Sequence, residues 1–170
     1  NIRWIDVSTK HLLLWNGKKA EVHEIVPDIS INISKNNLLG RIPRTQFVGE
    51  FNTEKTLNIW IFKEHIFLCQ NYGIIVCSLN GQAKKDVSFA DSEGVLRGSN
   101  RNNNFLVTYT SNNYIRVFDL SRRELKQVGV TRRFEDSKGP LGENIVCNIN
   151  CDGSKVSIIA HVKKGEGFEN

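Results

Sequence analysis

The sequence predicts an all-β protein, because short apolar groups rich in Ile, Val, Leu and Phe alternate along it with turn residues. No window keeps apolar residues at helical spacing over about a dozen positions. The dipeptides Asn16-Gly17, Asn80-Gly81 and Asp152-Gly153 are the third observation, since Asn-Gly and Asp-Gly tolerate the positive φ angles of tight turns between antiparallel strands. Consecutive strands are therefore expected to pair as hairpins.

Each expected strand is an apolar group bounded by Asn, Gly, Asp or Ser. In chain order the expected strands are His11–Trp15, Ala20–Val26, Thr56–Phe62, His65–Cys69, Gly73–Leu79, Asp86–Phe89, Asn104–Tyr109, Tyr114–Leu120, Leu125–Val130, Asn144–Ile149 and Lys155–Val162. Residues 27–55, with Pro27, Gly40 and Pro43, are expected to form an insert-like loop. A second polar insert is expected over residues 134–143, around Lys138-Gly139-Pro140.

A repeat recurs along the chain. The segment from His65, HIFLCQNYGIIVCSLNGQ, and the segment from Asn104, NFLVTYTSNNYIRVFDLSRRE, each contain two strands joined by an Asn-containing turn, and they start 104 − 65 = 39 residues apart. Weaker copies begin at His11 and Ser154. Units of about 40–45 residues are the blades of WD-type β-propellers. We therefore expect residues 1–170 to be part of one propeller domain, with about four blades of four-stranded antiparallel sheet; a β-sandwich is the alternative.

In the segment from Asn104, most of the charged residues lie between Tyr114 and Glu124. Phe118-Asp119 occupies the position of the Trp-Asp pair of such repeats, and Ser121–Glu124 is expected to be the turn that follows, so the charges are interpreted first as turn chemistry. Arginines are frequent anchors of protein interfaces. The candidate residues for exposed protein contacts are Arg122, Arg123, Arg132 and Arg133.

No pattern in the sequence predicts catalysis, a cofactor or a metal. A Gly-x-Ser-x-Gly elbow is absent, and among the four histidines only His23 has close acids on both sides. The cysteines, Cys69, Cys77, Cys147 and Cys151, lack the spacing of a zinc knuckle, and His65 near Cys69 has no second pair to complete a tetrahedral site. We expect no enzyme activity, no cofactor and no metal site.

The net charge of +5 is mild, and acids are interspersed with bases, which favours a dispersed surface charge over a nucleic-acid groove. Only Tyr114, Arg116 and Phe118 interleave aromatic and basic side chains as a nucleic-acid surface would. The longest apolar runs are too short to cross a bilayer. Few cysteines indicate a reducing intracellular compartment, and the lack of methionine predicts a piece of a longer or processed chain.

The stretch NNNFLVTYTSNNYIRVFDLSRRE, followed by NIVCNINCDGSKVSII, resembles the family of the second propeller of the intraflagellar transport 140 protein. The segments HLLLWNGKKAEVHEI and HIFLCQNYGIIVCSLNGQAKK precede it in the same order. The most specific pieces are Phe118–Glu124 and Trp15-Asn16-Gly17, and the resemblance covers roughly residues 9–159. The chain departs from the wider WD pattern, because it lacks a Gly-His pair and reduces Trp-Asp to Phe118-Asp119 or Cys77-Ser78.

This resemblance implies a non-catalytic scaffold subunit of intraflagellar transport complex A, which supports retrograde transport in cilia and the entry of ciliary cargo. The implied partners are other complex A subunits and ciliary cargo or adaptor proteins. The implied location is the cilium, the basal body and the cytoplasm. Another WD-repeat scaffold, such as a membrane-coat subunit of vesicle trafficking, is the alternative.

Overall fold

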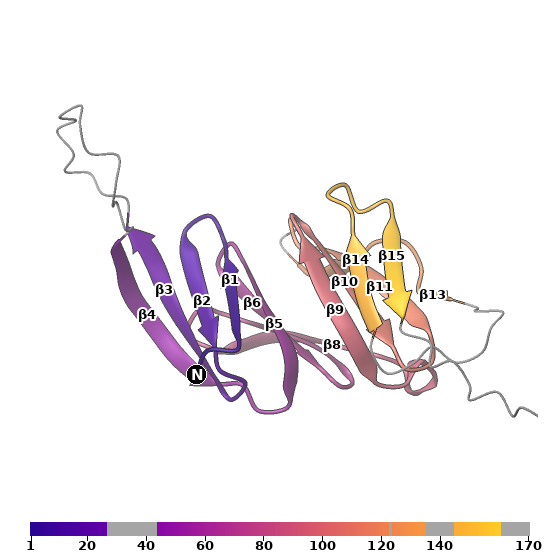
Figure 1. The fold of residues 1–170 in the computed structure, drawn as a ribbon, viewed down its shortest axis with the longest axis horizontal. Helices are drawn as coiled ribbons and strands as arrows, with labels where there is room; N and C mark the ends of the chain where they lie inside the picture. Colours follow the sequence, from indigo (N-terminus) through magenta and orange to yellow (C-terminus); the bar gives the residue numbers. More distant parts are fainter. Residues whose placement is uncertain (27–43, 123, 135–144, 161–170) are drawn as a thin grey trace, which may run out of the picture. The chain divides into compact units, whose positions relative to one another are not determined.

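The computed structural model describes residues 1–26, 44–122, 124–134 and 145–160 (Figure 1). Its elements there are fifteen strands and one short 3-10 helix, so the prediction of an all-β chain is confirmed. Within the sheets, successive strands pair as antiparallel hairpins, for example Trp4–Val7 with His11–Trp15, which confirms the meander expected from the turn dipeptides. Gly17, Gly81 and Gly153 of those dipeptides all have positive φ angles.

Among the described residues, two of the sheets have four strands in sequence order, a third has five and the fourth has two. The first contains β1 (Trp4–Val7), β2 (His11–Trp15), β3 (Lys19–Val26) and β4 (Arg44–Asn52); the second contains β5 (Thr56–Phe62), β6 (His65–Gln70), β7 (Gly73–Cys77) and β8 (Ala83–Ser88). The third contains β9 (Leu96–Asn102), β10 (Phe105–Thr110), β11 (Tyr114–Asp119) and β12 (Lys126–Gln127), and β13 (Arg132–Arg133) also pairs with β11. The fourth contains β14 (Ile145–Ile149) and β15 (Val156–Ala160), and the helix η1 (Asp91–Glu93) precedes β9.

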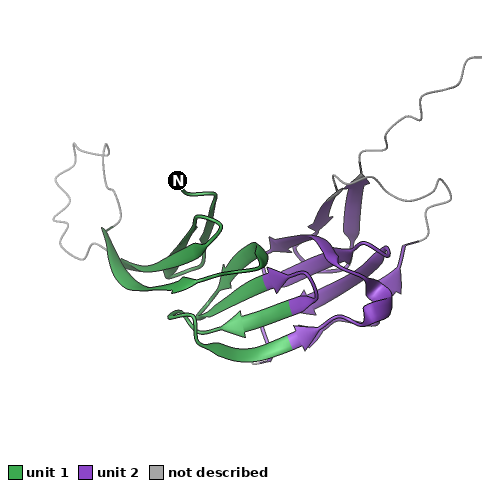
Figure 2. Cartoon of the chain, turned by 90° about the horizontal axis from the view of Figure 1, so that it is seen from below, with its two compact units in different colours: residues 1–68, 74–86 green, residues 69–73, 87–170 purple. Residues whose placement is uncertain are grey.

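The chain divides into two compact units, shown in green and purple in Figure 2. Unit 1 comprises residues 1–68 and 74–86, and unit 2 comprises residues 69–73 and 87–170. Each unit has a hydrophobic cluster of its own, and each is described separately below.

The core of unit 1 follows from the period-two alternation of its strands. In β2 every second side chain is buried, and Leu13 and Trp15 lie opposite Val22 and Ala20 of β3. Successive side chains of a strand point to opposite faces, so these residues share the covered face of the sheet. The buried indole of Trp15 donates a hydrogen bond from Nε1 to Thr53 Oγ1 at 2.8 Å, which satisfies its polar atom within the core.

The core of unit 2 joins the third and fourth sheets. Val107 and Tyr109 of β10 pack with Cys147 and Ile149 of β14. Asparagine side chains add polar contacts between β9 and β14: Asn100 Nδ2 lies 2.6 Å from Asn148 Oδ1, and Asn102 Nδ2 donates to the carbonyl of Ile149 at 2.8 Å. The two sheets are therefore held by a shared apolar layer and by specific amide contacts.

The prediction of an insert-like loop over residues 27–55 is wrong for the second half of that range. Residues 44–52 form β4, which pairs with β3 along its length, whereas residues 27–43 lie outside the described residues. Most β4 side chains are exposed, including the apolar Phe47 and Val48, and Phe51 is the partly buried contact of the strand with the core. Backbone pairing with β3 is what makes this segment a strand.

Other element boundaries also differ from the predictions. The strands β1 and β9 were not expected, because β1 is mostly exposed and β9 has the polar sequence LRGSNRN. The strand expected over Leu125–Val130 is reduced to β12, and Val128 begins a bulge. The second expected insert, residues 134–143, is described only at Phe134, which is not in a strand.

Candidate interaction surface

The turn after β11 is held by Asp119. Its carboxylate accepts hydrogen bonds from the Ser121 backbone N–H at 2.9 Å, the Ser121 hydroxyl at 2.6 Å and Arg122 Nε at 3.2 Å. The Ser121 hydroxyl bond, together with the backbone bond and Arg122, lowers the pKa of Asp119 despite the opposing effect of burial. The prediction that these charges serve the turn is confirmed for Asp119 and Arg122.

Arg132 and Arg133 lie near the other end of β11. In β13, Arg132 pairs with Ile115 and Arg133 pairs with Tyr114. The guanidinium carbon of Arg133 lies 5.9 Å from the centroid of the Tyr114 ring, within the range of a cation–π contact. Both arginine side chains are exposed.

The structure therefore does not gather the described candidate arginines, Arg122, Arg132 and Arg133, into one patch. Tyr114 and Asp119 are the first and last residues of β11, and 119 − 114 = 5 residues of strand span about 16 Å. Arg122 extends from the turn at one end, with 65% of its side chain exposed, while Arg132 and Arg133 lie at the other. Arg123 lies outside the described residues.

Arg132 also lines a groove of about 390 Å³ in unit 2, to which polar and apolar atoms both contribute. The lining comes from β11, from the bulge after β12 and from the β14–β15 hairpin, and consists of Ile115, Val117, Val128, Gly129, Val130, Arg132, Gly153, Ser154 and Val156. Val128 stays attached to β11 through a 2.7 Å hydrogen bond from its N–H to the carbonyl of Val117. Val130 is 75% exposed, so the bulge presents apolar surface to solvent.

The sequence did not predict this groove, because Val128, Gly129 and Val130 fall within the regular strand expected over Leu125–Val130. A positive φ angle of 67° at Gly129 is the local reason that the strand is interrupted there. The sequence signal that could have indicated it is the glycine between two valines, since an isolated glycine in a strand pattern often marks a bulge.

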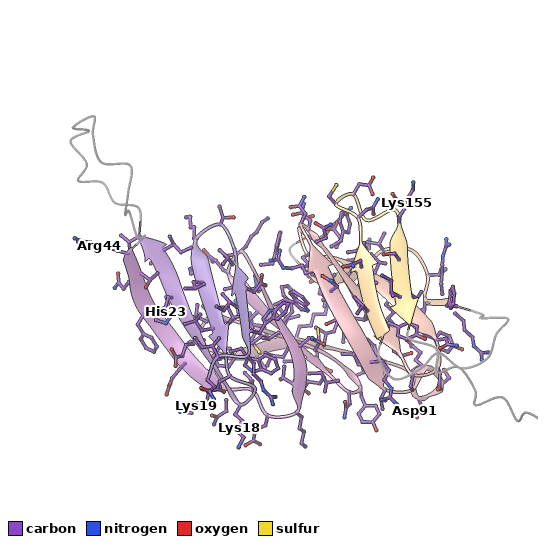
Figure 3. All side chains as sticks on the ribbon, in the orientation of Figure 1. Lys18, Lys19, His23, Arg44, Asp91 and Lys155 are labelled. Carbon is purple, nitrogen blue, oxygen red and sulfur yellow. The ribbon has the colours of Figure 1, made fainter. Side chains whose placement is uncertain are left out.

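His23 is partly buried, and Cys69 and Cys147 are buried. His23 on β3 lies 3.7 Å from Glu21 and contacts the Phe47 ring edge-on, with the centroids 5.7 Å apart (Figure 3). Burial raises the pKa of Cys69 to about 12 and that of Cys147 to about 11, which keeps both as thiols at neutral pH. Among the described residues, no three His, Cys, Asp or Glu side chains are grouped so as to hold a metal ion.

The sequence of the chain matches the model of one protein family over nearly its whole length. The family model described as the IFT140 second beta-propeller matches residues 1–169. The chain belongs to this family. As a member of the IFT140 second-propeller family, it has the fold class predicted from the repeat, a partial β-propeller of four-stranded antiparallel sheets, and that prediction is confirmed.

Solved structures similar to this chain have low sequence identity to it. Hsv2 from Kluyveromyces marxianus has a TM-score of 0.50 and 11% sequence identity, over 94% of this chain and 48% of that chain. The N-terminal domain of Nup159 has a TM-score of 0.45 and 17% identity, over 74% of this chain and 33% of that one. The computationally designed Ika4 protein has a TM-score of 0.48 and 12% identity, over 94% and 91%. The IFT140-family chain thus spans about a third of the Nup159 domain and about half of Hsv2.

A search of curated proteins finds no match to the chain. Within the described ranges, none of the helices has the length and apolar character needed to cross a membrane.

Proposed function

We propose that this chain is a non-catalytic scaffold module of intraflagellar transport complex A, which supports retrograde transport in cilia and the entry of ciliary cargo through protein–protein contacts. The observation that carries this proposal is the match of the IFT140 second-propeller family to residues 1–169. The expected partners are other complex A subunits and ciliary cargo or adaptor proteins. The expected locations are the cilium, the basal body and the cytoplasm.

The geometry supports a binding role for the exposed turns and edges of the sheets. Residues of rigid sheets hold adjacent turns in defined positions, and binding residues are frequent on such turns. The hydrogen bond to Asp119 orients Arg122, and the Tyr114 ring supports Arg133. An arginine that is already oriented loses less side-chain entropy on binding, which makes it a better anchor.

We infer that the arginines act as two separate contacts, because about 16 Å of β11 separates the ends that carry them. The first contact contains Arg122 with Arg123, and the second contains Arg132 with Arg133. Acidic residues of the partner are the expected complement at each contact, since guanidinium groups pair with carboxylates in two-point geometry.

The test uses the full-length protein in ciliated cells that lack the endogenous copy. The double variants Arg122→Glu with Arg123→Glu, and Arg132→Glu with Arg133→Glu, are expected to reduce recovery of complex A subunits on co-purification, or the ciliary signal, by at least threefold. Arg97→Glu, an exposed charge reversal on β9, is the matched control and is expected to retain both.

The outcomes separate the anchors from the scaffold role. Normal assembly and localisation of both double variants would discard the four arginines as anchors. Normal assembly, localisation and retrograde transport after deletion of residues 1–170 would overturn the scaffold proposal itself.

A further inference from the structure

Unit 1 contains a pocket in which two turns distant in sequence meet. Its volume is about 400 Å³, and its lining consists of Thr9, Lys10, His11, Lys63, Glu64 and His65. The first three residues belong to the β1–β2 turn and the start of β2, and the others belong to the β5–β6 turn and the start of β6. The Ser8 hydroxyl lies 3.5 Å from the carbonyl of Lys63, at the outer limit of a hydrogen bond between these turns.

His11 is the buried polar group of this pocket. Only 7% of its surface is exposed, and its Nδ1 atom is buried without a hydrogen-bond partner. Its backbone N–H is satisfied by the Ser8 hydroxyl at 3.2 Å, so the unsatisfied atom belongs to the imidazole. Buried polar atoms in folded proteins almost always have a partner, and an exception calls for a specific explanation such as a bound ligand.

The charges around the pocket favour an anion. Lys10 and Lys63 are exposed residues of the two turns, Lys63 Nζ lies 5.4 Å from the centroid of the Phe62 ring, and Glu64 is the carboxylate of the lining. Burial, followed by the positive charge of Lys84, lowers the pKa of His65, while Glu64 opposes this effect. Burial is the largest cause of this lowered pKa, and the effect of Lys84 exceeds the opposing effect of Glu64.

We propose that this pocket binds the phosphate group of a phosphorylated side chain in a partner protein. Lysine ammonium groups are point charges that bind phosphate, and neutral imidazoles can donate a hydrogen bond to its oxygens. A phosphate monoester carries nearly two negative charges at neutral pH, so it gains more from Lys10 and Lys63 than a carboxylate does. That the phosphate belongs to a protein rests on the proposed scaffold function, whereas the anion site rests on the pocket alone.

The test is histidine footprinting on the full-length protein, because diethyl pyrocarbonate modifies neutral imidazoles and mass spectrometry reports each histidine separately. The probe is O-phosphoserine at millimolar concentration, with serine, which lacks only the phosphate group, as the control. We expect phosphoserine to slow the modification of His11 and His65 at least threefold, with no change at His23, which is not in the pocket lining. Serine is expected to leave all three rates unchanged.

Charge variants test whether protection comes from the pocket. The pair Lys10→Glu and Lys63→Glu is expected to abolish protection by phosphoserine. Lys18→Glu is the matched control, since Lys18 and Lys19 lie at the end of the first sheet opposite Arg44, and Lys10 is bonded to Ile25 near the Arg44 end (Figure 3). Hydrogen exchange of the β2 and β5 peptides must match wild type in the double variant, so that lost protection is not lost folding.

The remaining outcomes overturn the proposal. Unchanged rates at His11 and His65 in phosphoserine, or equal protection in the Lys10–Lys63 double variant, would remove the phosphate site. Protection by vesicles containing phosphoinositides, without protection by phosphoserine, would replace the protein ligand with a lipid headgroup. Each of these results is independent of complex A assembly, so failure of the pocket and failure of the scaffold role are distinguishable.

Discussion

Glu93 and Arg116 form a buried ion pair that ties η1 to β11. Arg116 Nε donates to Glu93 Oε2 at 2.9 Å, a second bond joins Nη2 to Oε1, and the Ala90 N–H donates to the same carboxylate at 3.0 Å. Arg116 also lies over the Phe89 ring, 5.3 Å from its centroid. Burial by itself would raise the pKa of Glu93, but the bonds from Arg116 and Ala90 outweigh it and the pKa is lowered.

Glu93→Gln is therefore expected to destabilise the β9–β11 region by on the order of 3 kcal/mol, because it removes the charge that balances a largely buried arginine. Hydrogen-exchange mass spectrometry of the intact protein measures this as a loss of protection of roughly a hundredfold, since 1.4 kcal/mol corresponds to about a factor of ten. Asp91→Asn, which alters an exposed acid of the same short helix, is the control (Figure 3). Equal protection in the two variants would show that the pair contributes nothing.

The same pair gives a pH dependence with a defined sign. Because the folded pKa of Glu93 lies below the unfolded value of about 4.3, its stabilising effect is complete above that value and is lost as the pH falls through the folded pKa. Wild-type protection in β9–β11 is expected to fall on acidification below about pH 4, whereas Glu93→Gln shows a smaller change over the same range.

At the scale of elements, apolar alternation predicted the inner strands and missed several edge strands. In β2 and in the first half of β3, buried residues recur at every second position, so the pattern is visible in the sequence. The strands β1 and β4 are the edges of their sheet, and each is mostly exposed. Edge strands pair through their backbones on one side and need little apolar surface. The sequence of residues 44–52 therefore predicted a loop and not a strand.

The positions of the tight turns were predicted better than the edge strands were. Gly81 shows the physical reason. It has a φ angle of 82°, and the β7–β8 turn closes through the Gly81 N–H bond to the Ser78 carbonyl at 3.0 Å. A Cβ atom at Gly81 would lie 2.2 Å from Cγ of Phe51, far inside contact distance. The turn and its packing against β4 both require glycine.

Gly81→Ala is expected to destabilise the β7–β8 hairpin by more than about 1 kcal/mol, since a positive φ angle and a steric clash act together. Gly129→Ala is the matched control, because Gly129 has a φ angle of 67° but nothing lies within 4 Å of its added Cβ. Hydrogen exchange in the intact protein compares the local losses. Equal losses at the two sites would show that Phe51 moves aside and only the backbone angle matters.

At the scale of the whole molecule, stacking between repeat units is expected to limit stability. The fourth sheet has two strands among the described residues, and the facing pair Val146 and Ile159 is 55% and 65% exposed. Exposed valines also line the groove beside Arg132. Repeat units of this kind bury their faces by packing against neighbours.

The chain of residues 1–170 by itself is therefore expected to aggregate or to show loose tertiary packing. Binding of a hydrophobic dye and the concentration dependence of sedimentation check this. A sharp and reversible melt of a monomer, with no dye binding, would contradict it. The substitution of Val130 and Ile159 by Thr is expected to reduce aggregation, because both side chains are exposed in the structure.

The sequence by itself determined the all-β class, the hairpin turns, the repeat and the family, because these depend on residues close together in the chain. Asn80-Gly81 specifies its own turn, and the alternation in β2 specifies its own buried face. Tertiary structure alone decided that β4 is a strand, that Arg122 and Arg133 lie at opposite ends of β11, and that His11 and Lys63 share a pocket. Each of these depends on pairing between segments distant in sequence, which no local pattern encodes.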